Sequence, residues 1–233
     1  MSEEQEFWDD FAAEYAEIQQ ESQLTIAEDL ATFLKTNGIL PISSFVDLAA
    51  GSGRYIPAIL PDTKRYLAID FSVEMLKAAR RYVKDPQQKV DFRLQTQAEF
   101  LADKTTYPLI FTAMNPALTE KGQLISLVEK SRRLLILRIV RTKENIFQPL
   151  EQNDHKDEKL LSVYKKWLLE EQISFSTHLF SYAYEEIIDR EFFYRYFQQD
   201  IPQSELLQLS RSLFGEKKKA ISKTEIDYEL LIV

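Results

Sequence analysis

Residues 45–55 read FVDLAAGSGRY, an apolar stretch that carries one acidic residue and runs through small residues toward a polar end. The pattern predicts a β-strand, a tight turn and the first turn of a helix. Glycine at positions 51 and 53 lets a ligand approach the backbone closely, and a helix start presents free N–H groups to it. The segment therefore predicts a ligand-binding loop at the end of a strand.

Two common nucleotide-binding loops do not match these residues. In a dinucleotide-binding G-x-G-x-x-G motif a third glycine would follow Gly51 and Gly53 at position 56, where Ile56 stands. No G-x-x-x-x-G-K-[ST] sequence occurs, which excludes a P-loop nucleotidase. An NAD(P)-dependent oxidoreductase remains a weaker alternative.

Strands and helices are expected to alternate on both sides of this loop. Two one-sided helices, over 2–21 and 25–37, precede the first strand. Apolar runs predict strands at 44–48, 66–69, 90–94, 107–113 and 134–140, with helices from about residue 55, over 73–83 and near 123–131. Such alternation predicts an α/β fold with a doubly wound, mostly parallel sheet.

The last third of the chain has a different pattern. We expect a helix over 160–168, a strand from Ile173 that ends or bulges near Phe180, helices over 185–198 and 204–214, and a final strand over 226–232. The whole chain, 1–233, is expected to be one domain. Residues 1–40 would form a helical cap, 44–184 and 222–233 the core, and 185–215 an aromatic helical lid.

Composition limits the partners and ligands. The chain has 233 residues, of which 29 are basic and 37 acidic, and its net charge of −8 argues against nucleic acid or an anionic membrane as a partner. Without cysteine and with only His155 and His178, it lacks the usual ligands for zinc and most transition metals. No signal peptide or membrane-spanning run is recognisable, so we expect a soluble, cytoplasmic protein that is a monomer or homodimer.

The loop resembles motif I of the class I S-adenosylmethionine-dependent methyltransferases, in which an acidic residue precedes glycines at alternate positions. Asp47, Ala49, Gly51 and Gly53 occupy that register, with Ala50 between them. Alanine in place of the first glycine adds one methyl group and is expected to require a negative φ. The resemblance implies a Rossmann-like, seven-stranded sheet with an antiparallel last strand. It also implies S-adenosylmethionine as cofactor and S-adenosylhomocysteine as product.

A second acidic residue, Asp70, ends the apolar run that follows the loop. Its distance from the loop is close to the spacing of about 20 residues at which nucleotide-binding folds place a ribose-binding carboxylate. The resemblance implies that Asp70 binds the ribose and that Phe71 and Met75 flank adenine. The alternative is that Asp70 is only a neighbour of the helix cap at Ser72.

Three further places match the family less closely. Gln97 and Ala98 stand where the family has an acidic residue and alanine, which implies a contact with adenine, although a surface glutamine is the alternative. Met114 and Asn115 end the fourth strand, where the family brings donor and acceptor together, although an Asn-Pro pair also marks turns. Tyr15 could close the methionine end of the site, as the opening helix does in small-molecule methyltransferases, or could belong to that helix's core face.

Methyl transfer from a sulfonium is an in-line displacement, for which alignment alone can lower the barrier by about 7–11 kcal/mol. The sequence selects no catalytic base, although His155, His178 or a carboxylate could serve. A lidded pocket and an acidic chain favour a small-molecule acceptor. The alternative is a protein of the same fold that binds the cofactor without turnover.

Overall fold

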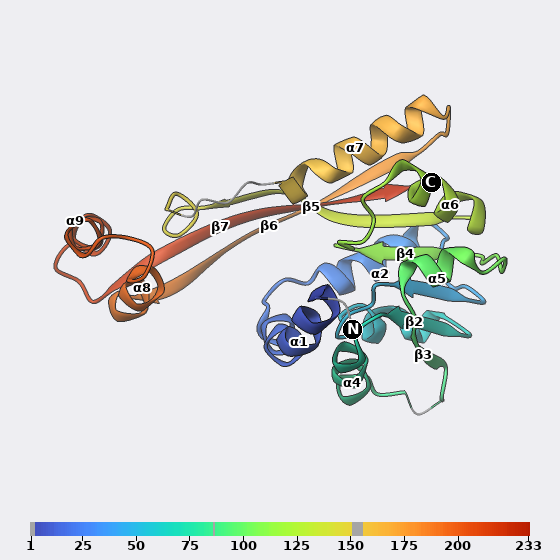
Figure 1. Cartoon of the computed structure of the whole chain (residues 1–233), viewed down its shortest axis with the longest axis horizontal. Helices are drawn as coiled ribbons and strands as arrows, with labels where there is room; N and C mark the ends of the chain where they lie inside the picture. Colours follow the sequence, from blue (N-terminus) through green and yellow to red (C-terminus); the bar gives the residue numbers. More distant parts are fainter. Residues whose placement is uncertain (1–2, 86, 151–155) are drawn as a thin grey trace. The chain divides into compact units, whose positions relative to one another are not determined.

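The computed structural model describes residues 3–85, 87–150 and 156–233 (Figure 1). The strands are β1 (Phe45–Leu48), β2 (Tyr66–Asp70), β3 (Val90–Leu94), β4 (Ile110–Ala113), β5 (Leu134–Glu144), β6 (Ser176–Asp189) and β7 (Lys219–Ile232). The helices are α1 (Glu3–Glu21), α2 (Ile26–Thr36), α3 (Ile56–Ile59), the 3₁₀ helix η1 (Leu60–Asp62), α4 (Val73–Tyr82), α5 (Gln97–Ala102), α6 (Lys121–Lys130), α7 (Lys156–Glu170), α8 (Arg190–Phe197) and α9 (Gln203–Phe214).

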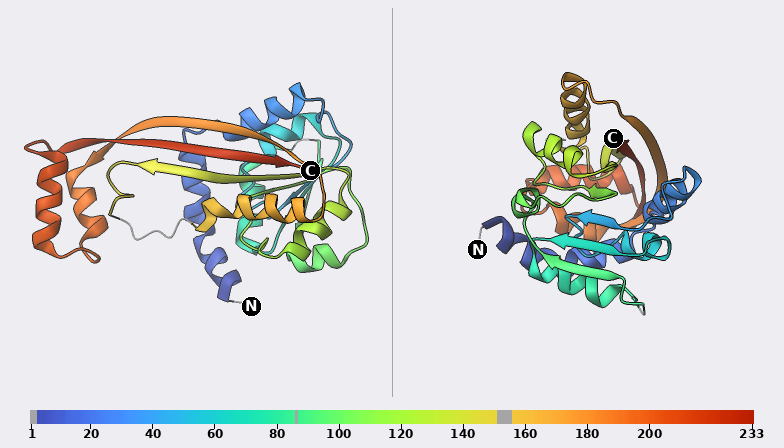
Figure 2. Two further views of the ribbon diagram at one scale, coloured as in Figure 1. Left: turned by 90° about the horizontal axis from the view of Figure 1, so that it is seen from above. Right: turned by 90° about the vertical axis from the view of Figure 1, so that its right-hand side faces the viewer.

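The described strands form one sheet in the order β3-β2-β1-β4-β5-β7-β6, with helices around it (Figure 2). The pairs β2–β3, β1–β2, β1–β4 and β4–β5 are parallel. Leu134 and Val233 exchange both backbone hydrogen bonds, each at 2.9 Å, which is the signature of an antiparallel pair. The predicted fold class is therefore confirmed, a mostly parallel sheet with antiparallel last strands.

Strands β1 and β2 form the centre of the core, because every residue of both is buried. Strands buried on both faces are typical of a parallel sheet covered by helices. The helix after β2 begins as expected at Ser72, whose hydroxyl oxygen accepts a hydrogen bond from the N–H of Met75. This cap fixes the direction in which the chain leaves the end of β2.

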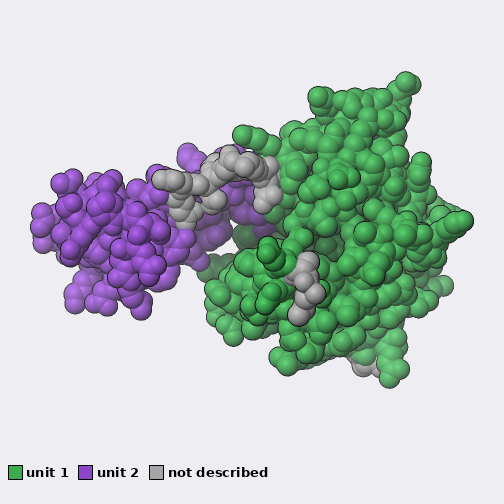
Figure 3. All heavy atoms as spheres, in the orientation of Figure 1, with its two compact units in different colours: residues 1–138, 159–180, 229–233 green, residues 139–158, 181–228 purple. Residues whose placement is uncertain are grey.

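The chain divides into two compact units (Figure 3). Unit 1 comprises residues 1–138, 159–180 and 229–233, and unit 2 comprises residues 139–158 and 181–228. Unit 2 has its own core, made of Ile146, Phe193, Phe197, Leu206 and Phe214. Strands β5, β6 and β7 contribute residues to both units.

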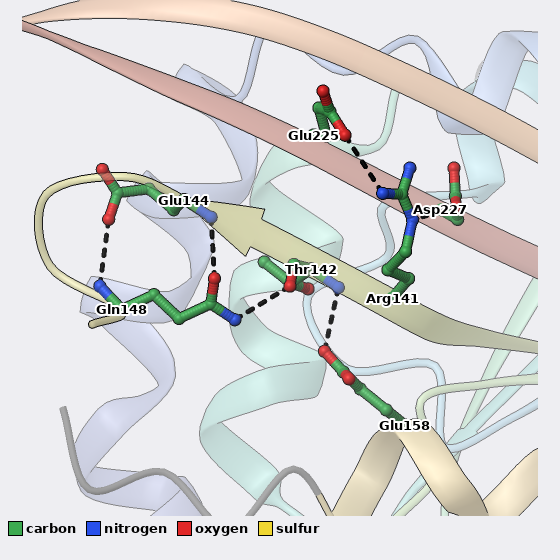
Figure 4. A network of polar contacts seen from close by, with 7 residues as sticks. All are labelled: Arg141, Thr142, Glu144, Gln148, Glu158, Glu225 and Asp227. Carbon is green, nitrogen blue, oxygen red and sulfur yellow. Dashed lines mark hydrogen bonds and ion pairs between the residues drawn. The ribbon is translucent and has the colours of Figure 1, made fainter.

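Polar contacts tie the strands of unit 2 to the loop after β5 (Figure 4). The Arg141 guanidinium pairs with Asp227 at 2.7 Å and with Glu225 at 3.0 Å. The Gln148 side chain accepts from the N–H of Glu144 and donates to the carbonyl of Thr142, both at 2.8 Å. The two Gln148 contacts satisfy backbone groups near the end of β5.

Several expected elements have different bounds. Strand β4 begins at Ile110 rather than at Tyr107, which forms only an isolated bridge to Ser131. The helix expected from about residue 55 is a single turn, α3, followed by η1, with a proline in the first turn of each. Proline lacks the N–H that a longer helix would need, and it restricts the residue before it.

The helix expected from Glu185 begins only at Arg190, and the strand does not end near Phe180. Residues 185–189 pair with β7 instead: Glu185 forms a 2.9 Å ion pair with Lys223, and the Arg190 N–H donates to the Lys218 carbonyl at 2.9 Å. The last strand correspondingly begins at Lys219 rather than near residue 226. Cross-strand pairing has overridden the helical spacing of the apolar residues.

None of the helices in the described part of the chain is long and apolar enough to cross a membrane.

Candidate functional site

Three neighbouring parallel strands, β2, β1 and β4, end at one edge of the sheet. The chain segments that follow them therefore lie close together, which is where open α/β sheets bind ligands. These segments are the glycine loop 49–53 after β1, residues 70–72 at the end of β2, and residues 114–116 after β4.

A cleft in unit 1 lies at this edge. It brings together seven of the predicted binding residues: Tyr15, Ala49, Gly51, Asp70, Phe71, Met75 and Met114. Trp8, Ala113 and Pro116 line it as well and were not among the predicted binding residues. Trp8 stands two helical turns before Tyr15, and that spacing on one helix face was the available signal.

Asp70 joins the first two segments. Its two carboxylate oxygens accept hydrogen bonds from the backbone N–H groups of Gly51, at 2.8 Å, and Ser72, at 2.9 Å. Burial raises the pKa of this carboxyl group, while the backbone donors oppose that shift. A carboxylate can accept about four hydrogen bonds, so capacity remains for ligand hydroxyl groups.

The backbone around the cleft adopts left-handed conformations at both glycines of the loop and at two other residues. Gly51 has φ of 53° and Gly53 of 82°, while Ala49 has φ of 61° and Met114 of 49°. The expectation of a negative φ at Ala49 is thus wrong: the loop keeps the glycine-like path although alanine stands there. Such strain concentrates at functional sites, where surrounding contacts hold it in place.

Three predicted residues lie next to the cleft without lining it. Ala50 is buried, and its N–H donates to the Ile69 carbonyl at 2.9 Å. A Cβ atom added at Gly53 would meet the Ala79 Cβ at 3.1 Å, so this glycine allows the loop to pack on α4. Asp47 is buried beneath the loop and accepts a 2.7 Å hydrogen bond from the Tyr66 hydroxyl. Burial raises the pKa of Asp47 to about 7.

Gln97 and Asn115 bind each other instead of lining the cleft. The Asn115 amide nitrogen donates to the Gln97 side-chain oxygen at 2.8 Å, and its oxygen accepts from the Ala117 N–H at 2.9 Å. Gln97 completes the ring by donating to the Ala117 carbonyl at 2.8 Å. Buried Arg138 donates to the Asn115 carbonyl at 3.0 Å. Ala98 is exposed on α5 and is not part of the cleft lining.

Helix α1 packs along α4 (Figure 1), and Asp9 of α1 binds the N-terminus of α4. One carboxylate oxygen of Asp9 accepts hydrogen bonds from the Ser72 hydroxyl at 2.5 Å and from the Glu74 N–H at 3.2 Å. The Gln5 side chain also donates to the Phe71 carbonyl at 3.1 Å. An acidic side chain at a helix N-terminus is stabilised by the free N–H groups and the helix dipole.

His178 does not line the cleft. The His178 ring stacks on Phe33 of α2 with ring centroids 4.1 Å apart, and His155 lies outside the described residues. Within residues 3–85, 87–150 and 156–233, no group of His, Cys, Asp or Glu side chains is arranged to hold a metal ion. Asp70 and Tyr15 are the ionisable residues that line the cleft.

Comparisons with known proteins agree with this geometry. A family model described as a methyltransferase domain matches residues 45–136, which span the glycine loop, Asp70 and β4. No protein of curated function matches the sequence.

Solved structures share the fold at low sequence identity. A protein from Anaeromyxobacter dehalogenans assigned as a type II methyltransferase is 12% identical, with a TM-score of 0.54 over 87% of this chain and 94% of that one. One from Pyrococcus horikoshii assigned as an RNA methyltransferase is 13% identical, with a TM-score of 0.53 over 91% and 84%. DhpI, in its complex with SAM and HEP, is 12% identical, with a TM-score of 0.51 over 97% and 99%.

At these identities the likeness concerns the fold alone, whereas the family model identifies the domain itself. The glycine loop, the carboxylate at the end of the next strand and the seven-stranded sheet agree with it. The family-model match over residues 45–136 and the shared fold support a place in the class I S-adenosylmethionine-dependent methyltransferase superfamily, with S-adenosylmethionine as the cofactor.

Proposed function

We propose that the cleft of unit 1 holds S-adenosylmethionine and that the enzyme transfers the methyl group to a small-molecule acceptor. The proposal rests on one observation: the buried Asp70 carboxylate at the end of β2 accepts a hydrogen bond from the Gly51 N–H of the glycine loop. Asp70 would therefore bind the sugar beside a loop whose glycines let a ligand approach the backbone.

The residues of the cleft suit the parts of this cofactor. Asp70 would accept hydrogen bonds from the ribose hydroxyls, and the apolar side chains of Phe71 and Met75 would flank adenine. The loop from Ala49 to Gly51 would follow the methionine tail, with Met114 at the end where the methyl group is transferred. Gln97 and Asn115 would stabilise the turn after β4 through their hydrogen bonds to each other and to Ala117.

The cleft must widen before it can accept the cofactor. It encloses about 50 Å³ of space that a water-sized sphere can occupy, against ~300–1,000 Å³ in typical small-molecule sites. The Tyr15 ring accounts for part of this closure, because its Cε1 would lie 3.6 Å from a Cβ atom at Gly51. A shift of α1 or of its rings is therefore the expected first step of binding.

In this proposal, the chain contributes alignment rather than covalent chemistry. The donor supplies an activated methyl group, so the residues need only hold the acceptor in line and keep water away. Apolar and aromatic lining residues suit that task.

Calorimetry with S-adenosylmethionine and S-adenosylhomocysteine tests the site. We expect both to bind, and Asp70→Ala to weaken both by more than about 1 kcal/mol, because a charged acceptor is lost. The matched control is Asp91→Ala on the neighbouring strand β3, whose partners are Arg65 and Arg93 and which should bind as the wild type does. Unchanged affinity in Asp70→Ala would place the cofactor elsewhere.

A methyl-transfer screen against metabolite pools tests the reaction. Product formation that depends on small molecules supports the proposal. Binding of both cofactor forms without turnover would favour a non-catalytic binding protein. Displacement of S-adenosylmethionine by a nicotinamide cofactor would favour an oxidoreductase.

A further inference from the structure

Helix α1 carries a continuous aromatic stripe, formed by Phe7, Trp8, Phe11 and Tyr15, which we call the α1 stripe. Adjacent ring centroids are 5.4 Å apart for Phe7–Trp8, 5.8 Å for Phe7–Phe11, 5.8 Å for Phe11–Tyr15 and 5.8 Å for Trp8–Tyr15. The Trp8 and Tyr15 rings are nearly perpendicular, with an interplanar angle of 83°. The stripe therefore presents both ring faces and ring edges.

The α1 stripe is only partly covered by the protein, because Trp8, Phe11 and Tyr15 are half-buried whereas Phe7 is exposed. The buried residues of α1 are Ala12 and Ala16, on the opposite side from Phe7, whose side chain is 58% exposed. Trp8 and Tyr15 belong both to the stripe and to the cleft lining. The aromatic surface thus runs without interruption from solvent to the cleft.

All the charged side chains of α1 are acidic. The helix contains eight carboxylates and no basic residue: Glu3, Glu4, Glu6, Asp9, Asp10, Glu14, Glu17 and Glu21. In helical rows, Asp10 follows Phe7 by three positions and Glu14 follows Phe11 by three, so these carboxylates flank the rings. Aromatic faces carry negative electrostatic potential and attract cations, and neighbouring carboxylates add to that attraction.

We propose that the α1 stripe recognises the methyl acceptor, and that the acceptor carries a positively charged nitrogen group such as an ammonium or guanidinium. The inference rests on the proposed function, because the stripe leads to the cleft assigned to the donor. Asp9 and Gln5 hold α1 in place for this role through their bonds to residues 71–74. A neutral apolar acceptor would gain nothing from the carboxylates.

Fluorescence of Trp8 gives a direct test. The chain has two tryptophans, so Trp167→Phe leaves Trp8 as the only one. In this background, saturated with S-adenosylhomocysteine, we would titrate choline and its uncharged isostere 3,3-dimethyl-1-butanol. We expect choline to bind at least tenfold more tightly, with an affinity that falls as salt is raised.

Two variants assign the preference to the stripe. Phe11→Leu keeps an apolar side chain but removes the ring, and the double variant Asp10→Asn/Glu14→Gln removes two flanking charges. Each should weaken choline binding threefold or more, while S-adenosylhomocysteine affinity stays within twofold. The matched controls, Tyr82→Leu on α4 and Glu129→Gln on α6, should change neither affinity.

The result that overturns the inference is equal binding of choline and its isostere, or binding of neither, by protein that still binds S-adenosylhomocysteine. Tighter binding of the isostere would indicate an apolar acceptor and would overturn it as well. Failure of the wild type to bind S-adenosylhomocysteine would instead reject the proposed cofactor site, so the two failures are distinguishable.

Discussion

The Tyr66 hydroxyl donates a 2.7 Å hydrogen bond to the Asp47 carboxylate inside the sheet, directly beneath the glycine loop. Both side chains are buried, and removal from water raises the pKa of Asp47 to about 7, although the Tyr66 hydrogen bond opposes the shift. Asp70 nearby raises it further through like-charge repulsion. Asp47 therefore changes charge near neutral pH in the folded protein.

This pKa predicts how stability depends on pH. The ordinary value in an unfolded chain is ~3.9, so Asp47 holds its proton more tightly when folded. Its contribution to stability is fully present below about pH 4 and is lost as the pH rises through about 7. Asp47→Asn should remove this loss and make the variant more stable than the wild type at pH 8, by up to roughly 4 kcal/mol.

Urea unfolding at several pH values between 4 and 8.5 provides the measurement. Tyr66→Phe is the informative partner variant: losing the hydrogen bond that lowers the pKa should move the stability change to higher pH. Asp47→Asn with the same pH slope as the wild type would show that another group is responsible.

Replacing each of two adjacent alanines by glycine should change the free energy of unfolding in opposite directions. Ala49→Gly should raise the free energy of unfolding by about 1 kcal/mol, because φ at this position is 61° and glycine adopts it without strain. Ala50→Gly, at a buried position without positive φ, should lower it by about 1 kcal/mol through chain entropy and lost packing. A loss of stability in both variants would mean that Ala49 is not strained.

The two glycines of the loop should respond differently to alanine. At Gly53 a Cβ atom would stand 3.0 Å from the Ile56 Cδ1 and 3.1 Å from the Ala79 Cβ, so Gly53→Ala should destabilise the fold by about 1–3 kcal/mol. At Gly51 the Cβ would meet Tyr15 at an ordinary 3.6 Å, within the cleft. Gly51→Ala should therefore cost the fold only the strain of a φ of 53°, about 1 kcal/mol, and should weaken cofactor binding through the methyl group that it places in the cleft. Thermal unfolding and calorimetry on both variants separate these effects, and equal losses of stability would contradict the prediction.

Gln97 and Asn115 should behave as one unit. Each makes its hydrogen bonds through the other or through Ala117, so Gln97→Ala and Asn115→Ala should not be additive, with an interaction energy of roughly 0.5–3 kcal/mol in a double-mutant cycle. Gln97→Glu adds a pH test. A protonated carboxyl group can still donate to the Ala117 carbonyl, whereas a carboxylate cannot, so this variant should lose stability as the pH rises. Additive losses would show that the two side chains act independently.

The central sheet and Asp70 were predictable because their signals are local. The apolar runs of β1 and β2 are buried along their whole length, and Asp70 directly follows such a run. The seven predicted residues that line the cleft lie close after strand ends or on the faces of α1 and α4, which residue spacing can identify. Their roles toward the cofactor stay predictions.

The remaining features depend on partners that are distant in sequence. Residues 185–189 have helical spacing, and pairing with β7, more than 25 positions later in the sequence, keeps them in a strand. The Gln97–Asn115 pair joins α5 to the turn after β4, and no spacing rule links the two residues. The φ of Ala49 follows from the path of the whole loop rather than from alanine's own preference.

The bond between Asp9 and the Glu74 N–H also makes one backbone amide a reporter for the opposite side of the cleft. Any ligand that lifts α1 must break this bond, and any ligand that pins α1 must strengthen it. Hydrogen–deuterium exchange at Glu74 would therefore register what happens at the Trp8 ring, without a label or a known acceptor.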